Sequence, residues 1–455
     1  MSFITKYWTY LDIGKQDIYA EKIIASPYSH SNFLTIDPSP AAAIPGPFLA
    51  PYTRLWHIIR IFVGDINTLS IWEHERHGPF MRIAHDEVSV CHPDVIRTLL
   101  LNPIPKYKVL ALPDHRIQTP MSTTDPGRRV EAAKNVASAY TLSNVIKSER
   151  YMNEMISLML DKFDQFSDKQ QSVEFDHWFN YLAFDIVGEV VFSQRFGFIK
   201  GGKDMGDSIA NSRTLNAYIT AAGYLQWLHN LTLGLYSLHR RETNPHARND
   251  MVEHWKRTLR EHSDRMMITH LQAVATGTVG AGADTVNAAL QSFVYHMLRK
   301  PQAQGRCNDP IVSFAHAQNM GYLQACIKES LRVFGPVPFG LARVAPKGGL
   351  KIGERHFPEG AERQRVGRPL SKELFGQDAA EYNPDRWIGE WAKRIEKYFM
   401  PVRFLGTCII RPVRHLATIE LSKVIATLPW KYMAYFTAVP YGRPCYISKR
   451  EDGLR

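Results

Sequence analysis

An acidic and a basic residue at helical spacing constrain this fold more than any other feature of the chain. Glu329 and Arg332 lie in the run Cys326–Val333 and, being three residues apart, share one face of a predicted helix. The later segment Asn383–Trp387 supplies a second arginine, Arg386. Because buried charges persist only when paired and hydrogen-bonded, the three side chains predict a network that fastens this loop onto a core helix. Glu-x-x-Arg alone is more typical of a solvated surface pair, and the added loop with Arg386 favours the buried network.

A lone cysteine, Cys408, follows this loop. The order of helix, N-P-D-R-W loop and cysteine resembles the cytochrome P450 family, and Phe184–Phe192 followed by Arg195–Phe198 resembles its filamentous-fungal branch. The resemblance implies a mainly α fold with a small β lobe in a single large domain. We expect that domain over residues 44–455, after a poorly ordered lead-in at residues 1–43.

The composition agrees with a folded protein that meets an anionic partner. Of the 455 residues, 45% are hydrophobic, which is enough to bury a sizeable core. The net charge of +11 favours an acidic redox partner or an anionic membrane surface. The basic residues are spread along the chain without a basic run or a zinc-ligand array, so we expect no nucleic-acid partner.

Cysteine usage and hydropathy bear on the compartment. The five cysteines include no C-x-x-C, which predicts a thiol-reducing compartment and no disulfide scaffold. The chain has no apolar run of the ~18–20 residues that a spanning helix needs, and residues 1–8 resemble neither a secretory signal nor an anchor. The P450 resemblance implies the endoplasmic reticulum membrane, so membrane association stays open.

Hydrophobic periodicity predicts a helical chain with a few short strands. The segment 301–322 looks too short to hold the helix usual for the family. We expect helices at 53–63 and 67–77, helix-rich segments at 128–166, 174–192 and 206–273, a strand at 80–84, and a small sheet formed by the apolar alternations near 338–344 and 349–353.

The run Ala281–Thr285 lies inside a long apolar segment. Glycine and Asp-Thr are poor choices for mid-helix, and a threonine hydroxyl can bond back to the preceding turn and bend a helix. Alternatively, Asp284 or Thr285 caps a helix that starts at Val286. The run matches the family motif (A/G)-G-x-D-T, which implies that Thr285 donates a hydrogen bond to bound oxygen and that Asp284 relays protons.

The resemblance also implies haem b, with the thiolate of Cys408 as axial ligand of its iron. Here the chain departs from the family pattern. Gly406 and Ile410 stand where the family has arginine and glycine, and the segment is about two residues too long. Pro412 is expected to prevent a helix from starting directly after the cysteine. The alternative is that Cys408 is a loop or core thiol.

Two cations match family positions that pair with haem propionates, Arg343 and Lys134; the alternative for each is a surface cation. Residues 361–372 and 401–414 depart from the family between well-matched neighbours. Compensated frameshifts, mis-set exon boundaries or a decaying gene would each produce such segments.

The resemblance implies a monooxygenase that inserts one oxygen atom from O2 into a small apolar organic substrate, with NADPH electrons delivered by a reductase. A non-catalytic, haem-poor remnant with the same fold, or an erroneous gene product, are the alternatives. The sequence does not indicate the substrate, because pocket residues vary freely on a fixed fold.

Overall fold

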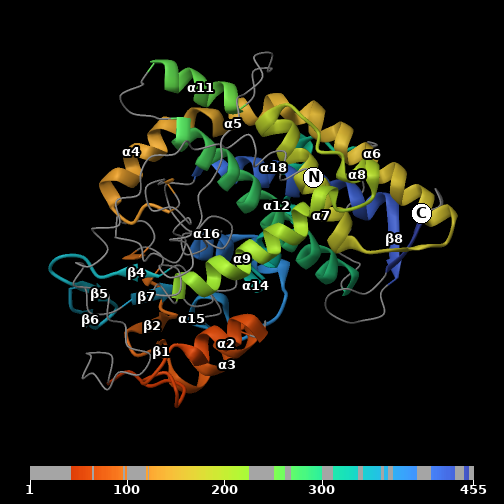
Figure 1. The fold of residues 1–455 in the computed structure, drawn as a ribbon. Helices are drawn as coiled ribbons and strands as arrows, with labels where there is room; N and C mark the ends of the chain where they lie inside the picture. The colour runs from red at the N-terminus through yellow and green to blue at the C-terminus, as the bar shows by residue number, and fades with distance from the viewer. Residues whose placement is uncertain are drawn as a thin grey trace. The chain divides into compact units, whose positions relative to one another are not determined.

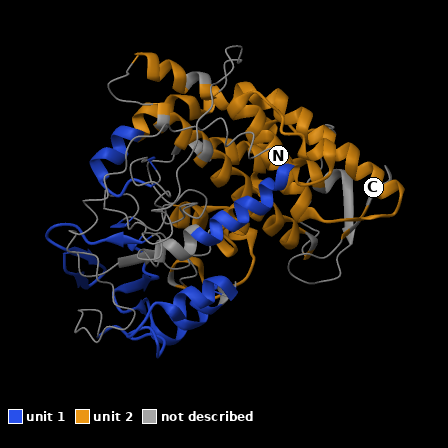
Figure 2. Ribbon diagram, viewed as in Figure 1, with its two compact units in different colours: residues 1–132, 206–245, 338–371 blue, residues 133–205, 246–337, 372–455 orange. Residues whose placement is uncertain are grey.

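The computed structural model describes most of the chain. The described residues are 43–63, 66–95, 98–99, 119–120, 122–224, 251–261, 268–299, 311–336, 342–359, 363–366, 372–396, 411–435 and 445–449. They form two compact units, and each unit is assembled from three separate segments of the chain (Figure 2). Unit 1 takes residues 1–132, 206–245 and 338–371, and unit 2 takes the rest. Because the segments interleave, no boundary cuts the sequence into consecutive domains.

Helices dominate the described residues, as predicted (Figure 1). No described helix is both long enough and apolar enough to cross a membrane. The longer helices are α2 (Leu55–Val63), α3 (Ile66–His77), α4 (Pro126–Ala137), α6 (Glu149–Asp168), α7 (Phe175–Phe192), α9 (Ser208–Tyr224), α11 (Met251–Glu261), α12 (Ile268–Arg299), α14 (Gly321–Val333) and α18 (Arg411–Lys431). The short helices are η5 (Ser138–Tyr140), α5 (Leu142–Val145), η6 (Ile146–Ser148), α8 (Phe198–Gly201), η7 (Met205–Asp207), α13 (Phe314–Asn319), α15 (Lys372–Phe375), η9 (Pro384–Trp387) and α16 (Glu390–Glu396).

The strands form three small sheets. A four-stranded sheet has the order β1-β2-β7-β4, a three-stranded sheet the order β3-β9-β8, and β5 pairs with β6. The strands are β1 (Phe80–Ala84), β2 (Glu87–Val90), β3 (Ser172–Val173), β4 (Arg343–Val344), β5 (Leu350–Ile352), β6 (Arg355–Phe357), β7 (Arg363–Val366), β8 (Tyr432–Tyr435) and β9 (Cys445–Lys449). The mainly α fold with a minor β part is confirmed.

The structure adds detail to the sequence pattern at three segments. Arg363–Val366, inside the basic stretch that departs from the family, forms β7 and pairs in parallel with β2. Backbone hydrogen bonding sets this pairing, and a search for apolar alternation does not detect it. The short region before Tyr322 does hold a helix, α13. The segment 128–166 is helix-rich as predicted and contains α4, η5, α5, η6 and the first part of α6.

The chain enters the first sheet through a proline-rich turn. The carbonyl of Pro45 accepts a hydrogen bond from the Arg82 backbone N–H of β1 at 2.9 Å. A Cβ added at Gly46 would lie 2.2 Å from the Arg82 carbonyl oxygen. Only glycine allows this approach of two backbones, so the turn fixes the start of the described chain against β1.

The fungal-type motif forms the buried helix α7 and its exit. Asp185, itself buried, accepts hydrogen bonds from the backbone N–H groups of Gly197, Phe198 and Ile199 at 2.7, 3.2 and 2.9 Å. These N–H groups lie at the start of α8, where a helix has no backbone carbonyl of its own to accept their hydrogen bonds. Burial raises the pKa of the Asp185 carboxyl, although the three N–H groups act in the opposite direction. The motif therefore fixes the turn that follows α7. Helix α7 itself packs against α12.

Candidate functional site

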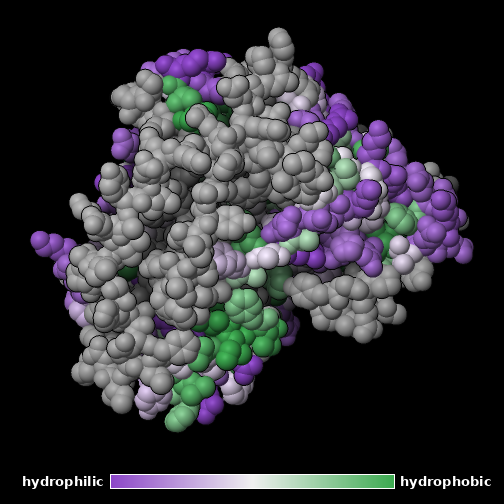
Figure 3. Space-filling view, in the orientation of Figure 1, coloured by the Kyte–Doolittle hydropathy of each residue, from purple (hydrophilic) through white to green (hydrophobic). Residues whose placement is uncertain are grey.

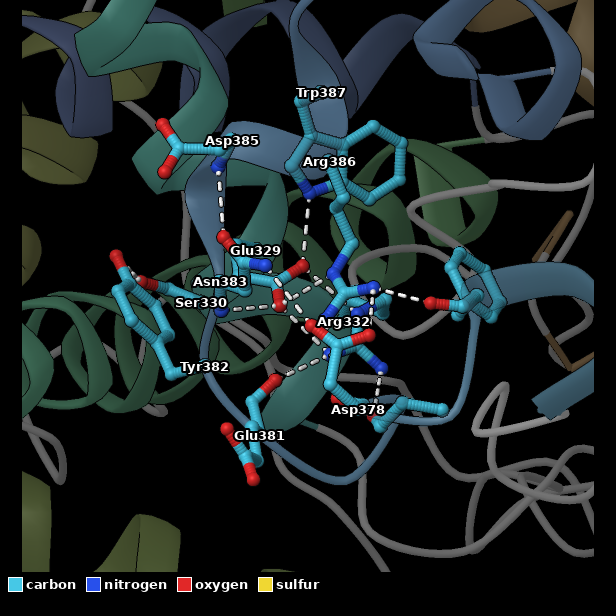
Figure 4. Close-up of polar contacts among 12 residues, drawn as sticks. Glu329, Ser330, Arg332, Asp378, Glu381, Tyr382, Asn383, Asp385, Arg386 and Trp387 are labelled. Carbon is cyan, nitrogen blue, oxygen red and sulfur yellow. Dashed lines mark hydrogen bonds and ion pairs between the residues drawn. The ribbon is translucent and has the colours of Figure 1, made fainter.

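The predicted charge network is present in unit 2 (Figure 4). Glu329 on α14 has no solvent exposure. The Arg332 guanidinium donates to both of its oxygens, at 2.8 and 2.7 Å, and Arg386 Nε donates to one of them at 3.0 Å. Two further donors were not predicted, namely the Trp387 indole N–H and the Asn383 backbone N–H, each at 2.8 Å. The carboxylate thus receives five hydrogen bonds, which fully uses its acceptor capacity.

The two arginines use their remaining N–H groups to hold the loop that precedes η9. Arg332 donates to the carbonyl oxygens of Ala379 and Glu381 at 2.6 and 2.9 Å. Arg386 donates to the carbonyl of Phe375 and to the Asp378 carboxylate. Burial would raise the pKa of Glu329, but the hydrogen bonds and charge of Arg332, with Arg386, hold it below its usual value.

The run Ala281–Thr285 lies in the middle of α12. The alternative in which Asp284 or Thr285 caps a helix is therefore wrong, because the helix begins at Ile268. The Thr285 hydroxyl donates to the Ala281 carbonyl at 2.6 Å, which is the predicted bond to the preceding turn. Gly282 faces α7, where a Cβ would lie 3.1 Å from Val187 Cγ2.

One face of α12 consists of small and polar side chains that are only half-buried. Ala281, Asp284, Thr285 and Ala288 have the spacing of one helix face, and all four keep partial exposure. Their neighbours Ala283, Val286 and Ala289 are fully buried on the other side. This face of α12 therefore stays partly accessible to solvent in the middle of the helix.

The two predicted propionate partners differ in their surroundings. Arg343, on β4 in unit 1, is only 2% exposed and donates to the Ala342 carbonyl at 3.2 Å. Lys134 on α4 is exposed. A surface cation therefore describes Lys134 but not Arg343, whose buried guanidinium needs polar partners. Their pairing with a propionate stays a prediction.

Cys408 lies outside the described residues, so its ligand role is a prediction that the structure does not address. α18 begins at Arg411, three residues after Cys408, with Pro412 in its first turn. Proline is tolerated in a first turn, since the first N–H groups of a helix have no intrahelical partner. The residues directly after Cys408 lie outside the described residues, so the expectation that Pro412 keeps a helix from starting there stays a prediction.

The buried cysteines that are described are poor thiolates. Burial raises the pKa of the Cys326 thiol to about 11 and that of Cys445 to about 12. A thiolate ligand needs a lowered pKa. Neither Cys326 nor Cys445 therefore suits a thiolate ligand.

The sequence patterns did not predict two buried charged residues on α18, Glu420 and Lys423. Lys423 has no solvent exposure, and its ammonium donates to Glu149 at 2.6 Å and to the Val312 carbonyl at 2.9 Å. Burial lowers the pKa of Lys423, while its hydrogen bond to the Glu149 carboxylate and the charge of that carboxylate act in the opposite direction. Glu420 is also buried, and neither of its oxygens has a hydrogen-bond partner in the described part of the chain.

Glu420→Gln is expected to become more stable than the parent as the pH rises. Burial raises the pKa of Glu420 well above its usual value. Its contribution to stability is therefore complete only below the unfolded-state pKa of about 4.3 and declines as the pH rises toward the folded-state value. The glutamine side chain cannot ionise. Urea unfolding between about pH 5 and pH 8 should show an advantage that grows by up to ~1.4 kcal/mol per pH unit. Glu396→Gln, at a half-exposed position, is the control, and an advantage independent of pH would contradict the prediction.

The cytochrome P450 family profile matches residues 45–402, most of the chain. The match includes α12, α14 and the loop that carries Arg386, and Cys408 lies beyond its end. The chain therefore belongs to the cytochrome P450 family and is a P450-type oxidoreductase.

Curated relatives come from filamentous fungi. Pisatin demethylase of Fusarium vanettenii is 27% identical over 76% of this chain and 74% of its own length. Cytochrome P450 monooxygenase asR2 of Sarocladium schorii is 26% identical over 86% of each chain, and hepC of Aspergillus oryzae is 26% identical over 87% of each. The monooxygenase class follows from the family and these relatives.

Proposed function

We propose that this chain is a haem-thiolate monooxygenase that inserts one oxygen atom from O2 into a small apolar organic substrate. The family match over residues 45–402 carries this proposal. Its relatives are a pisatin demethylase and P450 monooxygenases of filamentous fungi, and a role in secondary metabolism is part of this proposal. NADPH electrons would arrive through a reductase, which the net charge of +11 would attract if its docking face is acidic. We propose residues 44–455 as the catalytic domain and residues 1–43 as its lead-in.

The residues of this chain fit haem b. The half-buried face of α12 around Ala281 and Thr285 offers small side chains, against which a flat group can lie. Arg343 is a buried cation suited to a propionate. Cys408 would supply the thiolate, and Lys134 could add an exposed positive charge. Held by a thiolate, haem b supplies the oxygen-activating chemistry.

Within this scheme Thr285 and Asp284 handle protons. The Thr285 hydroxyl has a single proton and donates it to the Ala281 carbonyl, so the hydroxyl would turn away from that carbonyl to donate to O2 in the site. The half-buried Asp284 carboxylate can exchange protons with solvent and pass them on.

One observation favours a second candidate. Around Cys408 the chain lacks the arginine and glycine of the family pattern, and the family match ends before this segment. A haem-poor P450-like protein without turnover, acting at best as a binding protein, would follow if Cys408 does not bind iron.

Thr285→Ala is expected to lower product yield without lowering NADPH consumption to the same degree. Reconstituted with a reductase and offered apolar organic compounds under ¹⁸O2, the parent should form a product that carries one labelled oxygen atom. Loss of a proton-handling group typically costs about 10²-fold or more in the step that it assists. Thr285→Ser, which keeps the hydroxyl, is the matched control. Equal labelled product from the parent and Thr285→Ala would remove Thr285 from the mechanism.

A further inference from the structure

Polar side chains continue along α12 beyond its family motif. On α6 and α11 polar side chains lie at the surface, where Figure 3 shows hydrophilic areas. On α12, by contrast, Asp284, Gln291 and Tyr295 are half-buried, and so is Ala288 between the first two. We call these four residues the α12 stripe. Arg299, one turn after Tyr295, is exposed.

The four residues of the α12 stripe share one helix face. Seven residues make about two turns of an α-helix, so Asp284 and Gln291 point the same way. Ala288 follows Asp284, and Tyr295 follows Gln291, by four residues, which keeps both on that face. At about 1.5 Å per residue, Asp284 lies roughly 22 Å along the helix from Arg299. The stripe therefore runs from the middle of α12 to its solvent-exposed end.

A hydrogen bond fixes the Gln291 side chain within this stripe. Its amide nitrogen donates to Asn287 Oδ1 at 2.9 Å, and Asn287 is only 6% exposed. A glutamine amide has two N–H donors and a carbonyl acceptor, so this one bond leaves groups that can bind water. Ala288, on the turn between Gln291 and Asp284, carries only a methyl group. Fixed polar groups beside a small side chain favour ordered water.

The proposed reaction consumes protons beside α12. When one atom of O2 is inserted, the other leaves as water, which takes up two protons with the two electrons that NADPH supplies. We propose that these protons reach Asp284 along the α12 stripe, from solvent at Arg299 through water held by Gln291. This inference rests on the proposed monooxygenase function.

The protons balance without a further reactant. Asp284 passes a proton on and recovers one from the water beside it, and bulk water replaces that proton in turn. Gln291 is a positioning residue in this route, because an amide orients water but does not titrate.

Thiol labelling measures water access along the stripe without catalysis. In the full chain, with and without haem, Ala288→Cys should react with the small water-soluble reagent aminoethyl methanethiosulfonate. Mass spectrometry of the α12 peptide, which has no natural cysteine, reports this reaction. Ala289→Cys, at a 2% exposed position, is the matched control and should stay unlabelled. Adding Gln291→Trp to Ala288→Cys should abolish labelling, because the indole would cover the turn. Equal labelling of the two single cysteine variants, or undiminished labelling with Gln291→Trp, would overturn the proposal.

Turnover tests the role of Gln291 in proton delivery. Gln291→Leu should form product about tenfold more slowly, a smaller effect than the about 10²-fold or more for loss of the proton-handling group itself. Its ratio of rates in H2O and D2O should rise, because proton delivery then limits the rate. Gln291→Glu, which can still hold water, should restore the parent's rate and ratio.

The control for turnover is Gln272→Leu, at a half-buried position on another face of α12, which should change neither quantity. A Gln291→Leu protein with the parent's rate and isotope ratio would exclude Gln291 from the route. A parent that forms no product would remove the proposed function, and the labelling would still decide whether water follows the stripe.

Discussion

Glu329→Ala is expected to yield little soluble protein. The substitution leaves Arg332 and Arg386, which are 0% and 6% exposed, without their shared carboxylate. Removing one partner of a buried ion pair typically costs about 3–5 kcal/mol, a large share of the stability of a typical domain. The indole N–H of Trp387 and the backbone N–H of Asn383 also lose their acceptor. Expression yield and urea unfolding of any soluble fraction measure the effect.

An exposed ion pair between α14 and α16 provides the control. Lys328 pairs with Glu396 at positions that are 34% and 48% exposed, and exposed pairs contribute about 1 kcal/mol or less. Lys328→Ala should therefore unfold close to the parent. A soluble Glu329→Ala protein with the urea midpoint of this control would show that the network contributes little stability.

The same carboxylate predicts acid sensitivity. The folded-state pKa of Glu329 is lowered, so its contribution to stability is complete above the unfolded-state pKa and is lost as the pH falls through the folded-state value. Protonation would remove one of the acceptors on which both arginines depend. Unfolding on acidification should therefore release the loop that carries Arg386.

Cys408→Ala is expected to abolish both haem retention through a thiolate and product formation. Burial favours the thiol form of Cys326 and Cys445, so neither of these two cysteines is expected to replace the proposed thiolate of Cys408. Haem content per chain after size-exclusion chromatography gives a readout that does not depend on substrate. Cys91→Ala, at a partly buried described cysteine, is the control. Unchanged haem content and labelled product in Cys408→Ala would exclude the residue as ligand.

Sequence reasoning succeeded where the signal is local or tied to a rare order of motifs. The i, i+3 spacing of Glu329 and Arg332 and the later Arg386 predicted the network. The contributions of Trp387 and the Asn383 backbone escaped it, because they depend on how the loop returns to α14.

Other features were hidden by distance along the chain. Lys423 and Glu149 are 274 residues apart, and no local pattern connects them. The sequence did hold a local signal for the burial of Lys423. This residue lies on the same helix face as the buried residues Leu416 and Ile419, and a residue on that face is expected to be buried. The pairing of β7 with β2 likewise arises from backbone contacts between remote segments, to which side-chain alternation is blind.

The central claim is that Cys408 delivers a thiolate to haem iron in this chain, although the surrounding residues depart from the family pattern. The absorption spectrum of the purified, reduced protein under carbon monoxide tests it most directly. The account predicts bound haem with the red-shifted Soret band of a thiolate-ligated P450. Protein that carries no haem, or haem whose band is not red-shifted, would contradict the monooxygenase proposal and leave a P450-like fold without that chemistry.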